Sequence, residues 1–376
     1  SSVTRRCRIL FAGLPDYRFV FCIRTDTIAL IMKVLFFTYD FPYPTTSGGK
    51  VRSYNMLKYA GKGAEIFLFS FIRPGFQTEH TEALKKIGIS HIEVFPRRKV
   101  RDIRNIGALL PGDSIFKTLY FDRKVAARLR KVIEQEKIDV LHFESFYTAF
   151  YMSQTYAALG VKQVYGSENK EHALYEDYVK YNAPLLLKPG FRLQAQKIKR
   201  EEESIVKQAD VTLAVTESEK EYFQTLTKHP VVVIENGISH DEFSYKPRQK
   251  KAEKIILFVG NFDYFPNASA VKFFYDEVFS KITDQSVIFS IIGKKAGSLG
   301  LDTDKRVRTT EFIKDIRQAY YEADVFVSPI QIGGGTNFKI LEAMATGLPI
   351  VTFSDRVKDI GAKNMQDVLT ADNAQS

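Results

Sequence analysis

Residues 333–353 read GGGTNFKILEAMATGLPIVTF, and they decide which fold the chain can adopt. An apolar segment, 324–330, runs into the three glycines, and a helical pattern, Gly-Leu-Pro and a second apolar segment follow. Glycines let a ligand come close to the backbone, and a helix that starts just after them offers free N–H groups and a positive dipole end. The stretch therefore predicts a strand, a phosphate-binding turn and a helix in succession.

The predicted helix, 336–346, carries three side chains that suit a nucleotide. Thr336 can cap its N-terminus. Lys339 and Glu342 follow three and six residues later, within about 120° of Thr336 around the axis. A lysine side chain binds phosphate through its positive charge, whereas a carboxylate accepts hydrogen bonds from two sugar hydroxyls. The combination indicates a nucleotide or nucleotide-sugar ligand, and an ordinary strand–helix–strand unit with a glycine-rich turn is the alternative.

The same alternation of strands and helices runs through the chain from Met32. A first series of apolar strand candidates lies at 32–38, 64–71, 90–95, 138–143, 161–165, 210–215 and 231–234. A second series lies at 254–260, 287–292, 307–312, 324–330, 349–353 and 368–370. Helical patterns between them include 121–137, 217–228, 267–282 and 314–322. Such alternation predicts an α/β fold with parallel sheets.

A polar segment, 239–253, separates the two series and has a proline, a basic run and no apolar period, so it reads as a linker. We therefore predict two tandem Rossmann-like domains, 32–238 and 254–376. Their sheets leave a cleft between the carboxyl ends of the strands, where ligands of open α/β sheets bind.

Both ends of the chain look atypical. Residues 1–31 contain both cysteines, five arginines and no lysine, whereas Met32 reads as a native start. Charged residues interrupt any apolar core of a secretory signal there. We expect this segment to be an N-terminal extension that is loosely packed or upstream sequence. At the other end, Asp372 or Asn373 would cap a helix that does not follow, so we expect a truncated second domain.

Composition narrows the class of protein. Of the 376 residues, 45% are hydrophobic and 26% are charged, as is usual for a soluble globular protein. No apolar run reaches the ~18 residues that a bilayer span needs. Two cysteines provide no disulfide framework, and the six histidines show no metal-ligand spacing. We therefore expect an enzyme without a Cys-based or His-based metal site.

Positive charge is concentrated in the first part of the chain. Residues 1–250 hold 39 Lys and Arg against 28 Asp and Glu, whereas the remainder holds 15 against 16. Solvated helix faces are one reading, and an anionic partner such as lipid headgroups, a phosphorylated acceptor or nucleic acid is another. The stretch 179–200 mixes leucines with six basic residues and could face a membrane or an acceptor. A packed loop and exposed helix is the alternative there.

Taken in order, several segments resemble the retaining GT-B glycosyltransferases of the GT4 type, also called glycosyl transferases group 1. In the second domain these are 258–267, 291–293, 323–329 and 333–353; in the first they are 32–52, 138–144, 209–216 and 234–238. The resemblance covers about 32–371. It implies a GT-B fold with a nucleotide-sugar in the interdomain cleft, an acceptor on the first domain, often at a membrane surface, and neither metal nor cofactor.

The resemblance also assigns donor-binding residues. Glu342 matches a ribose ligand, Lys339 is the first candidate for the diphosphate cation, and Lys294 is the second. Gly334 stands where the family often has a carboxylate, so backbone N–H groups of Gly334 and Gly335 are expected to serve instead. Asn261 and Asn267 stand where many members carry Arg and Lys. The predicted donor-binding set is Gly48, Gly49, Gly260, Asn261, Lys294, Gly334, Gly335, Thr336, Lys339 and Glu342.

Three residues are predicted as catalytic. His142 and Glu144 match a polar pair that ends the fourth strand, near the reacting sugar and acceptor. Glu168 lies with Asn169 and Glu171 where the family often has a His-Asn-x-Glu pattern. For His142, a buried histidine with satisfied hydrogen bonds is the alternative.

The sequence thus predicts a cytoplasmic glycosyltransferase that moves a sugar from a UDP-, GDP- or ADP-sugar to a glycan, lipid-linked or small acceptor, with retention. An anionic membrane surface on the inner face is a further candidate partner for the basic first domain. A non-hydrolysing nucleotide-sugar epimerase or a phosphorylase would share the fold. A dehydrogenase is disfavoured because no Gly-x-Gly-x-x-Gly follows the first strand of either domain. Two complete α/β domains argue against a nucleic-acid partner.

Overall fold

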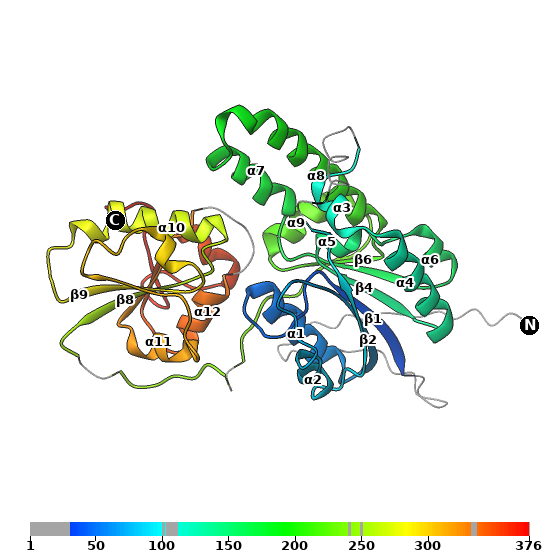
Figure 1. Ribbon diagram of the computed structural model, residues 1–376, viewed down its shortest axis with the longest axis horizontal. Coiled ribbons are helices and arrows are strands. Elements are labelled where there is room, and N and C mark those ends of the chain that lie inside the picture. The colour runs from blue at the N-terminus through cyan, green and yellow to red at the C-terminus, as the bar shows by residue number, and fades with distance from the viewer. Residues whose placement is uncertain are drawn as a thin grey trace, which may run out of the picture.

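The computed structural model describes residues 31–99, 102, 112–239, 242–248, 251–331 and 337–375. They form two parallel sheets, each covered by helices on both faces (Figure 1). This confirms the predicted GT-B architecture of two tandem Rossmann-like units. The N-terminal extension, 1–31, lies outside the described residues except for its last residue.

The first sheet has seven strands in the order β3-β2-β1-β4-β5-β6-β7. Every neighbouring pair is parallel, and Thr38 at the end of β1 lies beside Glu144 at the end of β4. The order reverses between these two strands, so they define the point where ligands of such sheets bind. The strands are β1 (Met32–Thr38), β2 (Ala64–Ile72), β3 (His91–Pro96), β4 (Val140–Glu144), β5 (Lys162–Gly166), β6 (Val211–Ala214) and β7 (Val231–Val233).

The second sheet has six strands in the order β10-β9-β8-β11-β12-β13, and its order reverses between β8 and β11. All its neighbouring pairs are parallel. The strands are β8 (Lys254–Val259), β9 (Val287–Ile292), β10 (Val307–Thr310), β11 (Val325–Ser328), β12 (Ile350–Thr352) and β13 (Leu369–Thr370). Each strand predicted from the sequence is present, and its ends differ by no more than two residues.

Helices α1 to α9 belong to the first sheet. They are α1 (Gly48–Ala60), α2 (His80–Lys85), α3 (Ile115–Tyr120), α4 (Arg123–Glu136), α5 (Phe146–Ala149), α6 (Gln154–Ala158), α7 (Glu171–Tyr181), α8 (Lys188–Gln208) and α9 (Glu217–Leu226). The second sheet carries α10 (Phe265–Glu277), α11 (Ile316–Glu322) and α12 (Phe338–Ala345). None of the helices in the described ranges has the length and apolarity that a bilayer crossing requires.

Helix α4 shows how the sequence specifies these elements. One apolar stripe of this helix is buried in the core, and the side chain of Asp122 caps its N-terminus by accepting from the backbone N–H of Lys124. The backbone leaves the helix at Lys137, which has a positive φ of 55°. The buried residues of the stripe are Val125, Leu129, Val132 and Ile133.

Both sheets are buried on both faces, because helices cover each side. Residues Val34 to Thr38 of β1 are all buried, and alternate side chains enter two different apolar clusters. In the second sheet, Phe258 and Leu257 of β8 likewise enter separate clusters.

One glycine is fixed by backbone contact next to the end of β8. Gly293 has a φ of 139°, and a Cβ built there would lie 1.9 Å from the carbonyl oxygen of Gly260. The loops after β8 and β9 therefore run against each other, which only glycine permits. This contact holds the segment from Gly260 to Asn261 at the edge of the second sheet.

The stretch 179–200 belongs to a helical hairpin. Helices α7 and α8 are joined by the turn Leu185–Leu187, and the pair stands out beyond the first sheet at the top of Figure 1. The three leucines of the turn are 80%, 93% and 57% exposed. The stretch therefore forms helices, of which α8 is partly buried through residues such as Ala195 and Ile198, and the three leucines of the turn lie exposed on the hairpin tip.

Candidate active site

The N-termini of two helices meet where the sheets face each other. Gly48 begins α1 and Phe338 begins α12, and a Cβ built on Gly48 would lie 2.8 Å from a ring carbon of Phe338. Figure 1 shows α1 and α12 on opposite sides of this junction. The structure therefore brings together two segments that the sequence predicts to bind the donor. Helix N-termini are suited to an anion, so their meeting point is the candidate donor site.

Part of the glycine-rich motif cannot be placed. Gly334, Gly335 and Thr336 lie outside the described residues. Helix α12 starts two residues later than predicted, so the N-cap position belongs to Asn337 rather than to Thr336. The Asn337 amide Nδ2 donates to Ser328 Oγ at 2.9 Å, which ties the start of α12 to the end of β11.

Lys339 lies between α12 and the start of α10. Its Nζ donates to Oδ1 of Asn267 at 2.8 Å and stands 4.6 Å from the centre of the Phe258 ring. The Asn267 amide Nδ2 in turn donates to the carbonyl oxygen of Asn261 at 2.8 Å. Burial lowers the pKa of Lys339 to about 7, although the charge of Glu342 opposes this. The Lys339 amine can therefore be charged or neutral near pH 7, depending on the groups beside it.

Glu342 follows one turn deeper on α12, as predicted from its spacing. One oxygen, Oε2, accepts from the hydroxyl of the buried Tyr320 at 2.6 Å. Burial raises the pKa of Glu342, while Tyr320 and Lys339 oppose the shift. The tyrosine fixes the carboxylate on the same helix that carries Lys339.

Lys294 and Gly260, two further predicted donor-binding residues, lie in different environments. Lys294 Nζ pairs with Asp263 at 2.7 Å, and its side chain is 67% exposed. Gly260 packs closely on Asn267, because a Cβ there would lie 2.9 Å from Cγ of Asn267. Gly260, Asn261 and Lys339 are therefore connected through Asn267, whereas Lys294 sits apart on a surface carboxylate.

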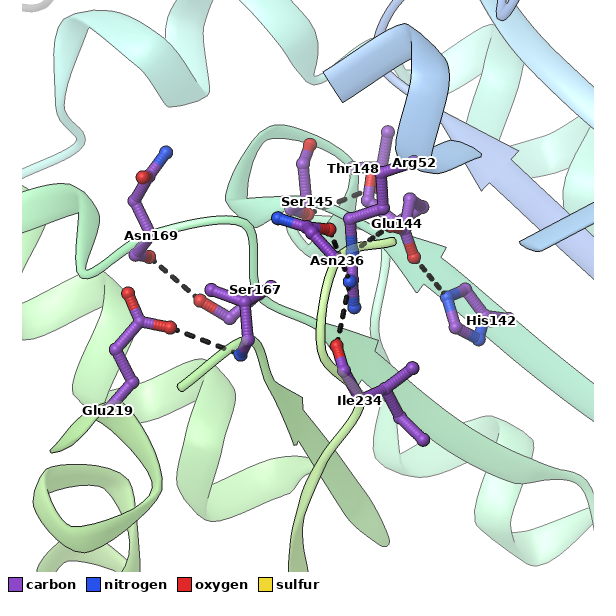
Figure 2. Close-up of polar contacts among 11 residues, drawn as sticks. Arg52, His142, Glu144, Ser145, Thr148, Ser167, Asn169, Glu219, Ile234 and Asn236 are labelled. Carbon is purple, nitrogen blue, oxygen red and sulfur yellow. Dashed lines mark hydrogen bonds and ion pairs between the residues drawn. The ribbon is translucent and has the colours of Figure 1, made fainter. Parts of the chain in front are cut away.

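A buried ion pair organises the edge of the first sheet (Figure 2). Arg52 of α1 donates from Nε to Oε1 of Glu144 at 2.9 Å, and the arginine and glutamate are 4% and 0% exposed. Its Nη1 also donates to the carbonyl oxygen of Ile234 and to Oδ1 of Asn236, both at 2.9 Å. Arg52 therefore joins α1, β4 and the segment that leaves β7 toward the second sheet. No local sequence pattern indicates this role, because the partners lie 92 and more residues away.

His142 completes this cluster from β4. Its Nε2 lies 2.5 Å from Oε2 of Glu144, and its ring stacks on Phe36 at 4.2 Å between centroids. Burial alone would raise the pKa of Glu144, but the charge of Arg52 and the hydrogen bond of His142 outweigh it and lower the pKa to about 2. Glu144 is thus an anion held on both oxygens, and His142 is a buried histidine with a hydrogen-bond partner.

Glu168 lies against the start of α1 in a different environment. A Cβ built on Gly49 would lie 2.6 Å from the hydroxyl of Tyr39 and 2.8 Å from Oε1 of Glu168. Burial and the nearby charge of Glu144 raise the pKa of Glu168 to about 8, and Arg52 opposes this. At neutral pH Glu168 therefore holds a proton that it can donate. The structure places the Glu168 carboxyl close to Gly49.

Glu171, three residues further along the chain, begins α7. Its Oε1 accepts from the hydroxyl of Tyr147 at 2.5 Å, and its backbone N–H donates to Oε1 of the buried Glu202 at 2.8 Å. Burial raises the pKa of Glu171 to about 7. Glu202 also bonds the ring of His172 through Nδ1, so the start of α7 is anchored to α8. Nowhere in the described ranges do three His, Cys, Asp or Glu side chains gather as a metal site.

Comparison with known families identifies this arrangement. The model of the family described as Glycosyl transferases group 1 matches residues 253–376, and that of Glycosyltransferase Family 4 matches residues 59–242. The two matches follow one another along the chain and cover most of both domains, with the N-terminus of α1 lying before the first of them. The chain belongs to this glycosyltransferase family. It is therefore a glycosyl-transferring enzyme, as the sequence predicted.

Solved structures of low sequence identity share the glycosyltransferase fold. Sucrose-phosphate synthase from Thermosynechococcus elongatus has a TM-score of 0.64 at 15% identity, covering 92% of this chain and 86% of that chain. Anabaena HepE, in complex with UDP and glucose, has a TM-score of 0.60 at 15% identity, with coverages of 92% and 87%. TarM has a TM-score of 0.60 at 12% identity, with coverages of 92% and 90%. A search of curated proteins gave no match.

The Arg52–Glu144 pair yields a stability prediction for this glycosyltransferase. Glu144→Gln keeps the side-chain volume but leaves the Arg52 cation buried without its counter-charge, so we expect a loss of about 3–5 kcal/mol in unfolding free energy. Because the folded pKa of Glu144 is lowered from 4.5 to about 2, the advantage of the unsubstituted chain is present above pH 4.5 and shrinks as the pH falls toward 2. Urea unfolding followed by circular dichroism at several pH values measures it.

Glu65→Gln is the control, because Glu65 pairs with Lys33 at 3.6 Å on the surface and should contribute no more than about 1 kcal/mol. Equal losses in the two variants, or a difference that does not change with pH, would contradict this account of the pair.

Proposed function

We propose that the enzyme transfers a sugar from a nucleoside-diphosphate sugar, with the diphosphate at the junction of α1 and α12. The observation that carries this proposal is the contact of Gly48 with Phe338, which sets two helix N-termini against each other. Each contributes backbone N–H groups and a positive dipole end, and both favour a polyanion. A bound diphosphate and a leaving nucleotide need this kind of preorganised stabilisation. UDP-sugars come first among the donors to test, because the HepE structures contain UDP and UDP-glucose.

In this proposal Lys339 supplies the cation for the diphosphate and Glu342 accepts the ribose hydroxyls. The support is that α12 carries both, that Asn267 steers the Lys339 amine, and that Tyr320 fixes Glu342. A phosphate beside Lys339 would replace the solvation that burial removes and restore its charge. Asn261 and Asn267 then act by placing Lys339, which accounts for the absence of Arg and Lys at those positions.

We further propose that transfer proceeds with retention and without a covalent glycosyl-enzyme. A covalent route needs an ionised carboxylate as nucleophile. Glu144 is ionised but held by Arg52 and His142, and Glu168 is a neutral acid at pH 7. In the proposed step the C1–O bond to the phosphate breaks and a C1–O bond to the acceptor forms on the same face. The acceptor's proton passes to the leaving phosphate oxygen, and Glu168 donates a hydrogen bond at the reacting centre.

For the partner of the first domain, we propose an anionic lipid surface. The stretch 179–200 includes six basic and no acidic side chains; Lys180 and Lys188 flank the exposed leucines of the hairpin tip in sequence, whereas Lys197 is buried. Apolar insertion together with attraction to anionic headgroups is the usual basis of interfacial binding. This arrangement would bring the acceptor side of the enzyme to the membrane.

Lys339→Met tests the donor site. It keeps the apolar stem over Phe258 but removes the charge, so we expect about tenfold weaker UDP binding by calorimetry. Binding should also take up a proton above pH 7, because the free Lys339 has a pKa of about 7 and the bound one a higher pKa. The affinity of the unsubstituted enzyme should therefore fall from pH 7 to pH 9 more steeply than that of the variant.

Lys272→Met, at an exposed site on α10, is the matched control and should bind UDP normally. If Lys339→Met keeps both the affinity and its pH dependence, the diphosphate does not contact Lys339.

Glu168→Gln tests the reaction step. With the nucleotide-sugar that gives the largest thermal shift, the rate should fall as the pH rises through about 8, because Glu168 then ionises beside the diphosphate. Glutamine cannot ionise but still donates, so this variant should keep most of the activity at pH 7 and lose the alkaline decline. Glu168→Ala should lose about tenfold to a hundredfold. Nuclear magnetic resonance of the product should show the donor's anomeric configuration.

Glu217→Gln, exposed on α9, serves as the control and should retain the profile of the unsubstituted enzyme. An inverted product would exclude retention. Isomerised nucleotide-sugar formed without acceptor would favour an epimerase instead.

Leu186→Trp tests the lipid surface, because the chain contains no tryptophan and the new residue is a unique fluorophore. Its emission should shift to the blue with vesicles of phosphatidylcholine and phosphatidylglycerol, and less with phosphatidylcholine alone. Leu159→Trp, at a 50% exposed leucine away from the hairpin, is the control and should not shift. The same response in both variants, or none in Leu186→Trp, would rule out docking through the tip.

A further inference from the structure

An aromatic pocket lies where the α7–α8 hairpin meets the start of α10. Its volume is about 300 Å³, at the lower end of the range for small-molecule sites. Both domains contribute to it, so it exists only with the two domains together. We call it the aromatic pocket, and it is lined by Phe116, Tyr147, Glu171, Leu174, Tyr175, Tyr178, Phe191, Tyr264 and Phe265.

The inner end of the pocket reaches the candidate reacting centre. Tyr147 lies 5.2 Å from Tyr39 between ring centroids, and the Tyr39 hydroxyl lies against Gly49 beside Glu168. From Tyr147 outward, each ring contacts the next. The centroid separations are 5.1 Å for Tyr147–Phe116, 5.8 Å for Phe116–Tyr175, 5.9 Å for Tyr175–Tyr178, 5.5 Å for Tyr178–Phe191 and 5.2 Å for Tyr178–Phe265.

The one carboxyl of the lining lies at this inner end, and the other polar side-chain groups of the lining are the hydroxyls of Tyr147, Tyr175, Tyr178 and Tyr264. Glu171 is the one charged residue in the lining, and its Oε1 already accepts from Tyr147. A sugar carries hydroxyls on every side, and burying them against rings without partners is costly. An apolar group has no such demand, and it gains from covering aromatic surface. The lining therefore suits an apolar chain that ends in a polar group.

The outer end of the pocket continues into the hairpin tip. Phe191 lies in the first turn of α8, and Leu187 ends the turn that precedes this helix. Leu186 and Leu185 beside it are 93% and 80% exposed. Apolar side chains thus run from the reacting centre through the pocket to a tip that points away from the body of the first domain (Figure 1).

We propose that the aromatic pocket binds the hydrocarbon chain of an amphipathic acceptor, whose hydroxyl lies at the inner end between Glu171 and Glu168. This deepens the proposed function and rests on it, because it names the acceptor class of that reaction: an alkyl or isoprenoid lipid with a polar head. The chain enters from the hairpin tip, and the head reaches the donor sugar. The pocket then selects acceptors by the apolar chain rather than by the sugar alone.

Calorimetry with n-decyl β-D-maltoside, below its micelle-forming concentration, and with maltose tests this inference. We expect the unsubstituted enzyme to bind the decyl compound at least about tenfold more tightly than maltose, because burial of each methylene adds affinity. Tyr178→Ala and Phe265→Ala should each reduce that preference about tenfold. Tyr181→Ala is the matched control, because Tyr181 lies on the same helix, is 57% exposed and does not line the pocket.

Binding of UDP and binding of the decyl compound are measured separately, so that a failure of this inference is distinguished from a failure of the proposed function. UDP binding is measured on the same samples, and Tyr178→Ala should retain it, which also shows that the variant is folded. If UDP binds but the decyl compound binds no better than maltose, the inference is wrong and the donor site stands. A preference that persists in both pocket variants also overturns the inference. If none of UDP, GDP and ADP binds the unsubstituted enzyme, the proposed function itself fails.

Discussion

The buried pair of Arg52 and Glu144 is the interaction on which the active-site geometry depends. A guanidinium and a carboxylate that both leave water must satisfy each other's hydrogen bonds, or they destabilise the fold. Arg52 bonds Glu144 through Nε and Ile234 and Asn236 through Nη1, and these partners belong to β4 and to the segment after β7, whereas its buried Nη2 has no hydrogen-bond partner among the described residues. The helix whose N-terminus faces the donor site is thereby fixed to the connection between the two domains.

The second constraint is steric, and it explains why glycine occurs where the domains meet. Gly48 touches Phe338 and Gly49 touches Tyr39 and Glu168, so side chains at these positions would separate α1 from its neighbours. Because α1 and α12 approach closely, both N-termini can face the same bound anion, and their dipoles stabilise it together. Gly48 and Gly49 therefore allow the close packing of α1 and, through it, the stabilisation of an anion by both helix N-termini.

Sequence patterns predicted those structural features that depend on residues close together in the chain. Apolar runs located β1 and β8 because buried parallel strands need no polar alternation, and spacing placed Lys339 and Glu342 on α12. Arg52 gave no such signal, because its partners are distant in sequence and a lone arginine in a helix is usually solvated. The aromatic pocket was missed for the same reason, since α3, α5, α7, α8 and α10 each contribute only one to four residues.

The two carboxyls at the edge of the first sheet show how the fold divides roles among similar residues. Glu144 and Glu168 both lie close to Arg52, yet the pKa of one is lowered to about 2 and that of the other raised to about 8. Arg52 and His142 hold Glu144 directly, whereas the pKa of Glu168 is raised first by burial and then by the negative charge of Glu144. The ionised Glu144 therefore adds to the effect of burial on its neighbour. The ion pair that anchors α1 therefore also sets Glu168 as the proton-bearing group beside Gly49, where the proposed reaction requires a donor.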